Sequence, residues 1–150
     1  MIVFRITKSN RASDISGSGA ALFPGRWNKK GTPVLYTGES KEIALLEVIV
    51  HTPPMFIPKL DILTIEIPDE TMTYLAISNL PSNWHHYPAP TILTEIGQKW
   101  VDSDLTLALR VPSSILHSSH NIILKCNHRD YTSVKILDQQ QFYFDSRLVQ

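Results

Sequence analysis

The sequence predicts an α+β fold whose core is a mixed or antiparallel β-sheet with a few helices. Segments with the composition of strands outnumber those with a helical pattern, and two of the connections between them are long. The chain has 150 residues, of which 43% are hydrophobic and 19% are charged. This length and composition fit one folded domain over residues 1–150, because no linker rich in Pro and Gly divides the chain.

In the N-terminal part, three segments have the pattern of strands: residues 2–6, 33–37 and 60–67. Residues 8–31 are rich in Ser, Gly, Asn and Lys and predict a long loop, in which residues 20–23 can form one helical turn. A loop of this length in a folded domain often has a functional role. Ser40 can cap a helix that runs to His51, where Thr52-Pro53-Pro54 ends it.

The C-terminal part contains four further predicted strands: residues 105–111, 121–124, 134–137 and 142–144. Residues 77–89 predict a polar connection, and Pro90 begins a second helix. That helix is expected to carry one apolar stripe: Ile92, Leu93, Ile96 and Trp100. Residues 139–141 are three glutamines, a run too short to predict a structure.

The charge balance excludes several classes of partner. Lys and Arg number 14, as do Asp and Glu, so the formal net charge is zero. A neutral chain lacks the overall field that holds nucleic acid or an anionic membrane surface, and no apolar run approaches the ~18 residues that span a bilayer. Arg5 interrupts the apolar start, so no signal peptide is predicted. The single cysteine, Cys126, excludes a disulfide within the chain and fits a reducing cytoplasm.

The segment Gly25–Gly31 is the first candidate site. It holds Arg26, Asn28 and two lysines between glycines, and such a loop can present a fork of donors to a phosphate or carboxylate. A solvated basic loop would have the same composition. The spacing alone does not decide between these two interpretations.

Glu47 is the second candidate. It lies in a helix that is apolar nearly all round, the pattern of a buried helix, and it shares a stripe with Ile43, Leu46 and Val50. Burying an ionised carboxylate without partners costs several kcal/mol, so Glu47 is either paired in the core or lines a cleft. Burial raises a carboxyl pKa unless cations or donors hold the group ionised.

Tyr36, at the end of the strand before that helix, is the third candidate. Its ring can stack on a planar ligand or pack in the core. The six histidines predict no metal site, because they lack ligand spacing and because adjacent residues such as His85 and His86 point to opposite faces of a strand. Cys126 has no evident base beside it, so a thiol enzyme is not expected.

A set of short motifs is more specific in its order and spacing than any one of them. The motifs are Gly17-x-Gly19-Ala20, Gly25-Arg26-Trp27-Asn28-x-x-Gly31-x-Pro33-Val34-x-Tyr36-x-x-Glu39-Ser40, Leu46-Glu47-x-x-Val50-His51, Arg110-Val111-Pro112-Ser113, Asn127-His128-x-Asp130-Tyr131 and Phe144-Asp145-x-Arg147-Leu148. Together they resemble the RES domain family, the toxins of bacterial toxin–antitoxin pairs whose antitoxin is an Xre-type helix-turn-helix protein. The resemblance covers almost the whole chain.

The resemblance implies a fold like that of ADP-ribosyltransferase toxins and the consumption of NAD as substrate, without a metal. In the family an arginine, a tyrosine and a glutamate form the site, and the matching positions here are Arg26, Tyr36 and Glu47. Arg5 matches an arginine that faces the same cleft, and Ser113 matches a late serine. Two places depart from the family: Lys125-Cys126 stand where it commonly has Asn-Pro, and Arg129 stands where it commonly has proline.

The expected activity is cleavage of the bond between nicotinamide and ribose in NAD. Arg26, assisted by Arg5, would hold the pyrophosphate, Tyr36 would face the nicotinamide ring, and Glu47 would stabilise positive charge that develops on the sugar. The acceptor can be water or phosphate; protein ADP-ribosylation and a non-catalytic binding module are the alternatives. The expected partner is the Xre-type antitoxin, in a hetero-oligomer, and a homo-oligomer also stays open.

Overall fold

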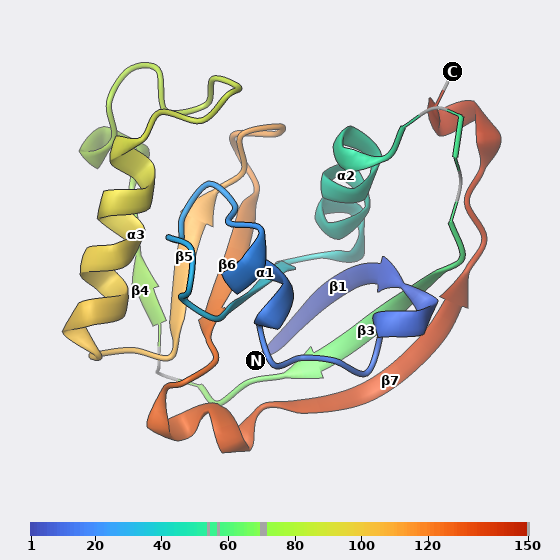
Figure 1. The fold of residues 1–150 in the computed structure, drawn as a ribbon, viewed down its shortest axis with the longest axis horizontal. Helices are drawn as coiled ribbons and strands as arrows, with labels where there is room; N and C mark the ends of the chain where they lie inside the picture. The colour runs from blue at the N-terminus through green and yellow to red at the C-terminus, as the bar shows by residue number, and fades with distance from the viewer. Residues whose placement is uncertain (54, 57, 70–71, 150) are drawn as a thin grey trace.

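A seven-stranded, mostly antiparallel sheet forms the frame of the protein (Figure 1). The computed structural model describes residues 1–53, 55–56, 58–69 and 72–149. Its strands are β1 (Ile2–Lys8), β2 (Val34–Gly38), β3 (Leu60–Glu66), β4 (Met72–Tyr74), β5 (Ala108–Pro112), β6 (His120–Lys125) and β7 (Lys135–Phe142), and its α-helices are α1 (Ser18–Leu22), α2 (Lys41–His51) and α3 (Ile92–Ser103). Short 3₁₀ helices cover Ser9–Arg11, Ile77–Asn79, Arg129–Ser133 and Ser146–Val149.

The sheet has the order β4-β5-β6-β2-β1-β3-β7, and only the β4–β5 pair is parallel among these strands. Its two halves meet at one point, where Phe4 of β1 pairs with Gly38 of β2. By contrast, β1 pairs with β3 from Ile2 to Lys8. Beyond Phe4 and Gly38 the strands β1 and β2 therefore diverge, and the two half-sheets leave space between them.

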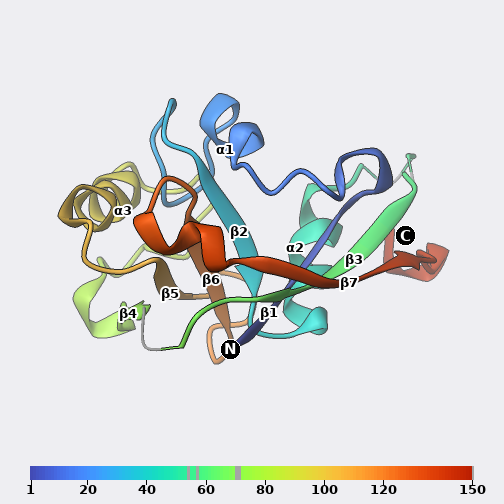
Figure 2. The same ribbon diagram turned by 90° about the horizontal axis from the view of Figure 1, so that it is seen from below.

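Each half-sheet has its own helix. In Figure 1, α2 stands beside β1 and α3 beside β4 and β5, on either side of β6. Helix α3 buries Leu93, Trp100 and Val101 against a cluster that includes Trp27 and Trp84. Helix α2 packs through its own buried residues onto the other half, where β3 and β7 lie side by side as an antiparallel pair and β7 leads to the C-terminus (Figure 2).

The structure confirms the α+β class and most of the predicted elements, including the Ser40 cap, whose hydroxyl accepts a hydrogen bond from the Ile43 amide at 3.2 Å. The second helix begins at Ile92 rather than Pro90, and Ile92 is the one exposed member of its apolar stripe, at 43%. The short strand β4 was not predicted. Among the described residues, no helix is long and apolar enough to cross a membrane.

Two expectations from apolar patterning were wrong. Helix α2 is not a buried helix: it buries Ile43 and Ala44, while Val50 is 56% exposed. Residues 142–144 are not a separate strand, because Phe142 ends β7 and the two residues that follow lie outside it. The glutamine run is part of β7, where Gln139 donates to the Asp61 carboxylate at 2.6 Å.

Candidate active site

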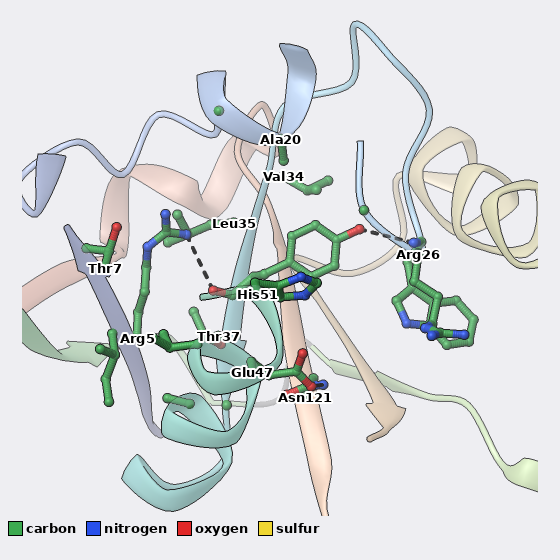
Figure 3. Close-up of a pocket in the computed structure, with 18 of the residues that line it drawn as sticks. Arg5, Thr7, Ala20, Arg26, Val34, Leu35, Thr37, Glu47, His51 and Asn121 are labelled. Atoms are coloured by element: carbon green, nitrogen blue, oxygen red, sulfur yellow. Dashed lines mark hydrogen bonds between the residues drawn. The ribbon is translucent and has the colours of Figure 1, made fainter. Parts of the chain in front are cut away.

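A cavity of about 930 Å³ opens between the half-sheets and is lined by both of them (Figure 3). Its charged lining residues are Arg5, Arg11, Asp14, Arg26 and Glu47. The arginines give this cavity one positive charge in excess, although the chain as a whole is neutral. A local cationic surplus in a hollow suits an anionic ligand.

The loop that carries Arg26 is held in shape by Asn28. This side chain is 0% exposed; its Oδ1 accepts from the Gly25 amide at 2.8 Å, and its Nδ2 donates to the carbonyls of Ala20 at 2.9 Å and Thr32 at 3.3 Å. Asn28 therefore supplies no donor to a ligand, unlike the sequence interpretation in which the loop presents a fork of donors. Its hydrogen bonds hold the loop in its conformation.

Arg26 is fixed by the chain that precedes α3. Its Nη1 donates to the carbonyl of Trp84 at 2.7 Å and to that of His86 at 3.0 Å. Partial burial lowers the pKa of the guanidinium, and the nearby Glu47 carboxylate opposes that effect. Within the described part of the chain Arg26 makes no salt bridge, so its remaining N–H groups can bind an anion.

Tyr36 forms a rigid wall of the cavity. Its hydroxyl accepts from the Trp27 amide at 3.0 Å and donates to Asn28 Oδ1 at 2.7 Å. A Cβ on Gly25 would lie 2.8 Å from the phenol ring, so only glycine lets the loop approach this closely. Burial raises the pKa of Tyr36, which keeps the phenol neutral. The hydroxyl is occupied by hydrogen bonds to the loop, so Tyr36 presents its ring to the cavity.

Glu47 enters the cavity from α2 and meets Asn121 of β6 (Figure 3). Asn121 Nδ2 donates to Glu47 Oε1 at 2.8 Å. Sequence reasoning missed Asn121, and no local pattern marks it, because the pairing depends on how α2 and β6 are brought together. Glu47 is half-buried and lines a cleft, which answers the question that the sequence left open.

Arg5 reaches the cavity from β1, on the far side from Arg26 (Figure 3). Its Nη1 donates to the Tyr36 carbonyl at 3.5 Å, across the point where the half-sheets separate. Its Nε is buried and has no hydrogen-bond partner among the described residues. Burial lowers the pKa of this guanidinium, and no carboxylate is paired with it in the described chain.

Ser113 is placed differently from the other expected site residues. It is 1% exposed, and its hydroxyl accepts from the amides of Ile115 at 3.1 Å and Leu116 at 3.2 Å, which closes a turn. The cavity is lined by its neighbour Ser114 instead. The structure thus brings Arg5, Arg26, Tyr36 and Glu47 to one cavity, whereas Ser113 is buried and is not part of the lining.

Three histidines gather beside the Arg26 loop. The ring of His85 lies 4.8 Å from that of His86 and 4.9 Å from that of His117, measured between centroids. The adjacent pair lies at a turn, in which the His86 amide donates to the Asn83 carbonyl, and not on a strand. Among the described residues there is no group of three potential ligands that could hold a metal ion.

Comparison with known proteins adds to this geometry. The RES domain model matches residues 2–145. A protein named Toxin Res from Photorhabdus laumondii is 37% identical over 155 residues, covering 99% of this chain and 97% of its own length. Toxin Res from Yersinia enterocolitica is 33% identical and covers 99% of both chains. A Sphingobium protein named Prs ADP-ribosylating toxin is 31% identical, covering 95% of this chain and 91% of its own.

Among solved structures, a chain of the M. tuberculosis MbcT–MbcA toxin–antitoxin complex has the same fold. It matches with a TM-score of 0.78 at 17% sequence identity, over 94% of this chain and 83% of that chain. The α+β architecture is therefore shared with a protein of low sequence similarity.

Proposed function

Because the chain belongs to the RES domain family, we propose that it is a toxin that consumes NAD by cleaving the bond between nicotinamide and ribose. The observation that carries this proposal is one cavity lined by Arg5, Arg26, Tyr36 and Glu47. These side chains come from β1, β2, α2 and a loop, yet they face the same space. Two arginines that have no carboxylate partner in the described chain, an aromatic wall and a carboxylate suit an anionic dinucleotide whose nicotinamide ring is cationic.

Each residue has a distinct role in this reaction. The guanidinium of Arg26, aligned by two backbone carbonyls, binds the pyrophosphate, and Arg5 adds a second positive charge from the opposite wall. The ring of Tyr36 packs against the nicotinamide. Glu47 accepts a hydrogen bond from a ribose hydroxyl and stabilises the positive charge that develops on the sugar as nicotinamide leaves. Nicotinamide is already cationic in NAD, so the reaction needs no general acid.

The acceptor distinguishes two forms of the activity. Water gives ADP-ribose and phosphate gives its phosphorylated form, and either requires only access to the cavity. Transfer to a protein side chain is the second candidate, favoured by the relative named Prs ADP-ribosylating toxin, at 31% identity. Because NAD is a cytoplasmic metabolite, the proposed activity takes place in the cytoplasm.

We further propose that an antitoxin protein neutralises the activity, in a hetero-oligomer with this chain. The matching fold comes from a toxin–antitoxin complex, and the three relatives reported above are named toxins. An Xre-type helix-turn-helix protein is the partner expected from the family resemblance. To neutralise the toxin, such a partner has to obstruct the cavity or the path to it.

Turnover of NAD with identification of the products tests the proposal. The purified protein is incubated with NAD labelled in the adenine ring, with and without phosphate, and with and without a cell extract. Free ADP-ribose indicates hydrolysis, its phosphorylated form indicates phosphorolysis, and labelled protein indicates transfer. If no NAD is lost under any condition, the protein is a non-catalytic binding module and the proposal is wrong.

A further inference from the structure

We infer that Asn121 is a positioning residue, which holds the Glu47 carboxylate in the orientation that the cleavage needs. This inference rests on the proposed function. Glu47 is carried by α2, and the residue that fixes it belongs to the opposite half-sheet (Figure 3). The contact between them is the hydrogen bond from Asn121 Nδ2 to Glu47 Oε1, at 2.8 Å.

The backbone of Asn121 is a fixed support. It pairs with Gly38 of β2 on one side and with Val111 of β5 on the other. The amide of the residue before it, His120, donates to Glu39 Oε1 at 2.9 Å, and Glu39 is in turn paired with Arg110 at 3.1 Å. The backbone that carries the donor is therefore held by strands on both sides and by the contact of the preceding residue with Glu39.

The acceptor is on a much less constrained element. Helix α2 buries only Ile43 and Ala44 fully, is exposed at both ends, and packs mainly on the β1 side of the cavity. Among the described residues, the Asn121–Glu47 bond is the one side-chain hydrogen bond that joins α2 to the β4-β5-β6-β2 half. A glutamate side chain has three rotatable bonds, so without this contact its carboxylate would sample several orientations.

The other end of the Asn121 amide argues for function rather than stability. Its Oδ1 is buried and has no hydrogen-bond partner in the described chain. A desolvated, unpaired acceptor costs stability, and an apolar side chain of the same size would avoid that cost. The opposite orientation of the amide would aim Oδ1 at the carboxylate, so it does not relieve the problem. An asparagine that costs stability at this place is explained by what its Nδ2 holds.

Asn121→Leu separates the two explanations. If Asn121 positions Glu47, we expect kcat for NAD loss to fall by about tenfold or more, with KM within about twofold of the wild type. We also expect the thermal midpoint to stay the same or rise, because the unpaired buried acceptor is removed. A merely structural asparagine would give the reverse, a lower midpoint with kcat within about twofold of the wild type in the folded protein, and that result would overturn the inference.

Gln139→Leu is the matched control. Gln139 also donates an amide hydrogen bond to a carboxylate, that of Asp61 at 2.6 Å, but neither residue lines the cavity. We expect its kcat to equal that of the wild type. A tenfold loss of kcat in this control would show that breaking any such bond perturbs the enzyme and would overturn the inference.

Asn121→Ala decides the question if the leucine variant does not fold. Alanine is smaller than asparagine and has no hydrogen to donate to Glu47, so kcat must again fall. An unchanged kcat would overturn the inference. Wild-type protein that consumes no NAD would overturn both the proposed function and this inference, whereas an active wild type with equally active Asn121 variants would overturn this inference alone.

Discussion

Two acidic residues of the described chain line the cavity. Glu47 extends from α2, and Asp14 belongs to the N-terminal loop. Among the described residues, Oε2 of Glu47 has no hydrogen-bond partner, whereas Oε1 is held by Asn121. The guanidinium of Arg26 is close enough to interact with this charge but forms no salt bridge with it. The carboxylate is thus oriented without being neutralised, which is the state that can stabilise a developing cation.

Glu47→Gln is expected to leave the fold intact and to lower NAD turnover by about 10²- to 10³-fold, because an amide of the same size carries no charge. The measurement is the rate of NAD loss, together with the thermal midpoint. Glu42→Gln is the control, since Glu42 is an exposed residue in the first turn of the same helix and does not line the cavity. Wild-type turnover by Glu47→Gln would remove Glu47 from the mechanism.

Arg26→Ala is expected to weaken NAD binding by about 10- to 100-fold, the effect of losing hydrogen bonds to a charged group. Calorimetry in the Glu47→Gln background measures this affinity while the dinucleotide stays intact. Lys29→Ala, an exposed lysine in the same loop, is expected to bind as tightly as the background protein. An equal affinity in the Arg26 variant would contradict the phosphate role of Arg26.

Among single residues, the sequence predicted the acid, the ring and two of the cations that line the cavity, Arg5 and Arg26, because the residues that match a family motif keep their order along the chain. It could not predict Asn121, whose partner lies 74 positions away. It also left the role of Asn28 open. A loop with this composition can present the asparagine to a ligand or bury it in hydrogen bonds to its own backbone, and only the folded loop shows which of the two occurs.

Among the elements, α3 and the Arg26 loop are in unusually close contact. A Cβ on Gly97 of α3 would lie 1.7 Å from the carbonyl oxygen of Trp27. The loop is therefore pressed directly against the helix backbone, and Trp27 is buried in the same cluster as Trp100. The position of Arg26 thus depends on a helix that supplies no charged residue to the cavity.

Gly97→Ala is expected to destabilise the protein by about 1–3 kcal/mol, because the new methyl group overlaps the loop and forces it away from α3. Thermal unfolding measures the loss, and reduced affinity for NAD would report the displaced Arg26. Gly19→Ala in α1 is the control, since a Cβ there meets no atom within 4 Å and alanine favours helix. A Gly97 variant as stable as the wild type would show that the Trp27 backbone is not packed against Gly97.

Element prediction failed where pattern and environment disagree. The apolar sequence of α2 predicts burial on all sides, but the helix has one packed face and borders the cavity. The glutamines of β7 carry no strand signal, and they form a strand because β3 offers a continuous edge to pair with. Lys125, which stands where the family commonly has asparagine, has a structural role in this chain. Its ammonium donates to the Val101 carbonyl at 2.8 Å and pairs with Asp104, directly after α3.

On the scale of the whole molecule, the long N-terminal loop is fastened to the C-terminal third of the chain. Cys126 lies behind it, with Sγ 3.8 Å from the Ile15 carbonyl, and the Tyr131 hydroxyl donates to the same carbonyl. Gly17 is packed so closely that a Cβ there would lie 2.6 Å from the sulfur. This junction supports the loop whose residues form one wall of the cavity.

The same junction predicts how stability depends on alkaline pH. Burial raises the pKa of the Cys126 thiol to about 11 and also raises the pKa of Tyr131. The folded state therefore keeps protons that the unfolded state releases, so the stabilising contribution is complete below pH 9 and is lost as the pH rises toward 11. We expect the thermal midpoint of the wild type to fall through this window.

Cys126→Ala removes the thiol from this balance while leaving the smaller side chain room beneath the loop. Its thermal midpoint, measured at intervals from pH 8 to 11, is expected to fall less steeply than that of the wild type, because fewer protons are released on unfolding. A residual slope remains in the variant because Tyr131 still titrates on unfolding. Parallel curves for the two proteins would show that the thiol is as free to ionise in the folded chain as in the unfolded one, and that the junction does not bury it.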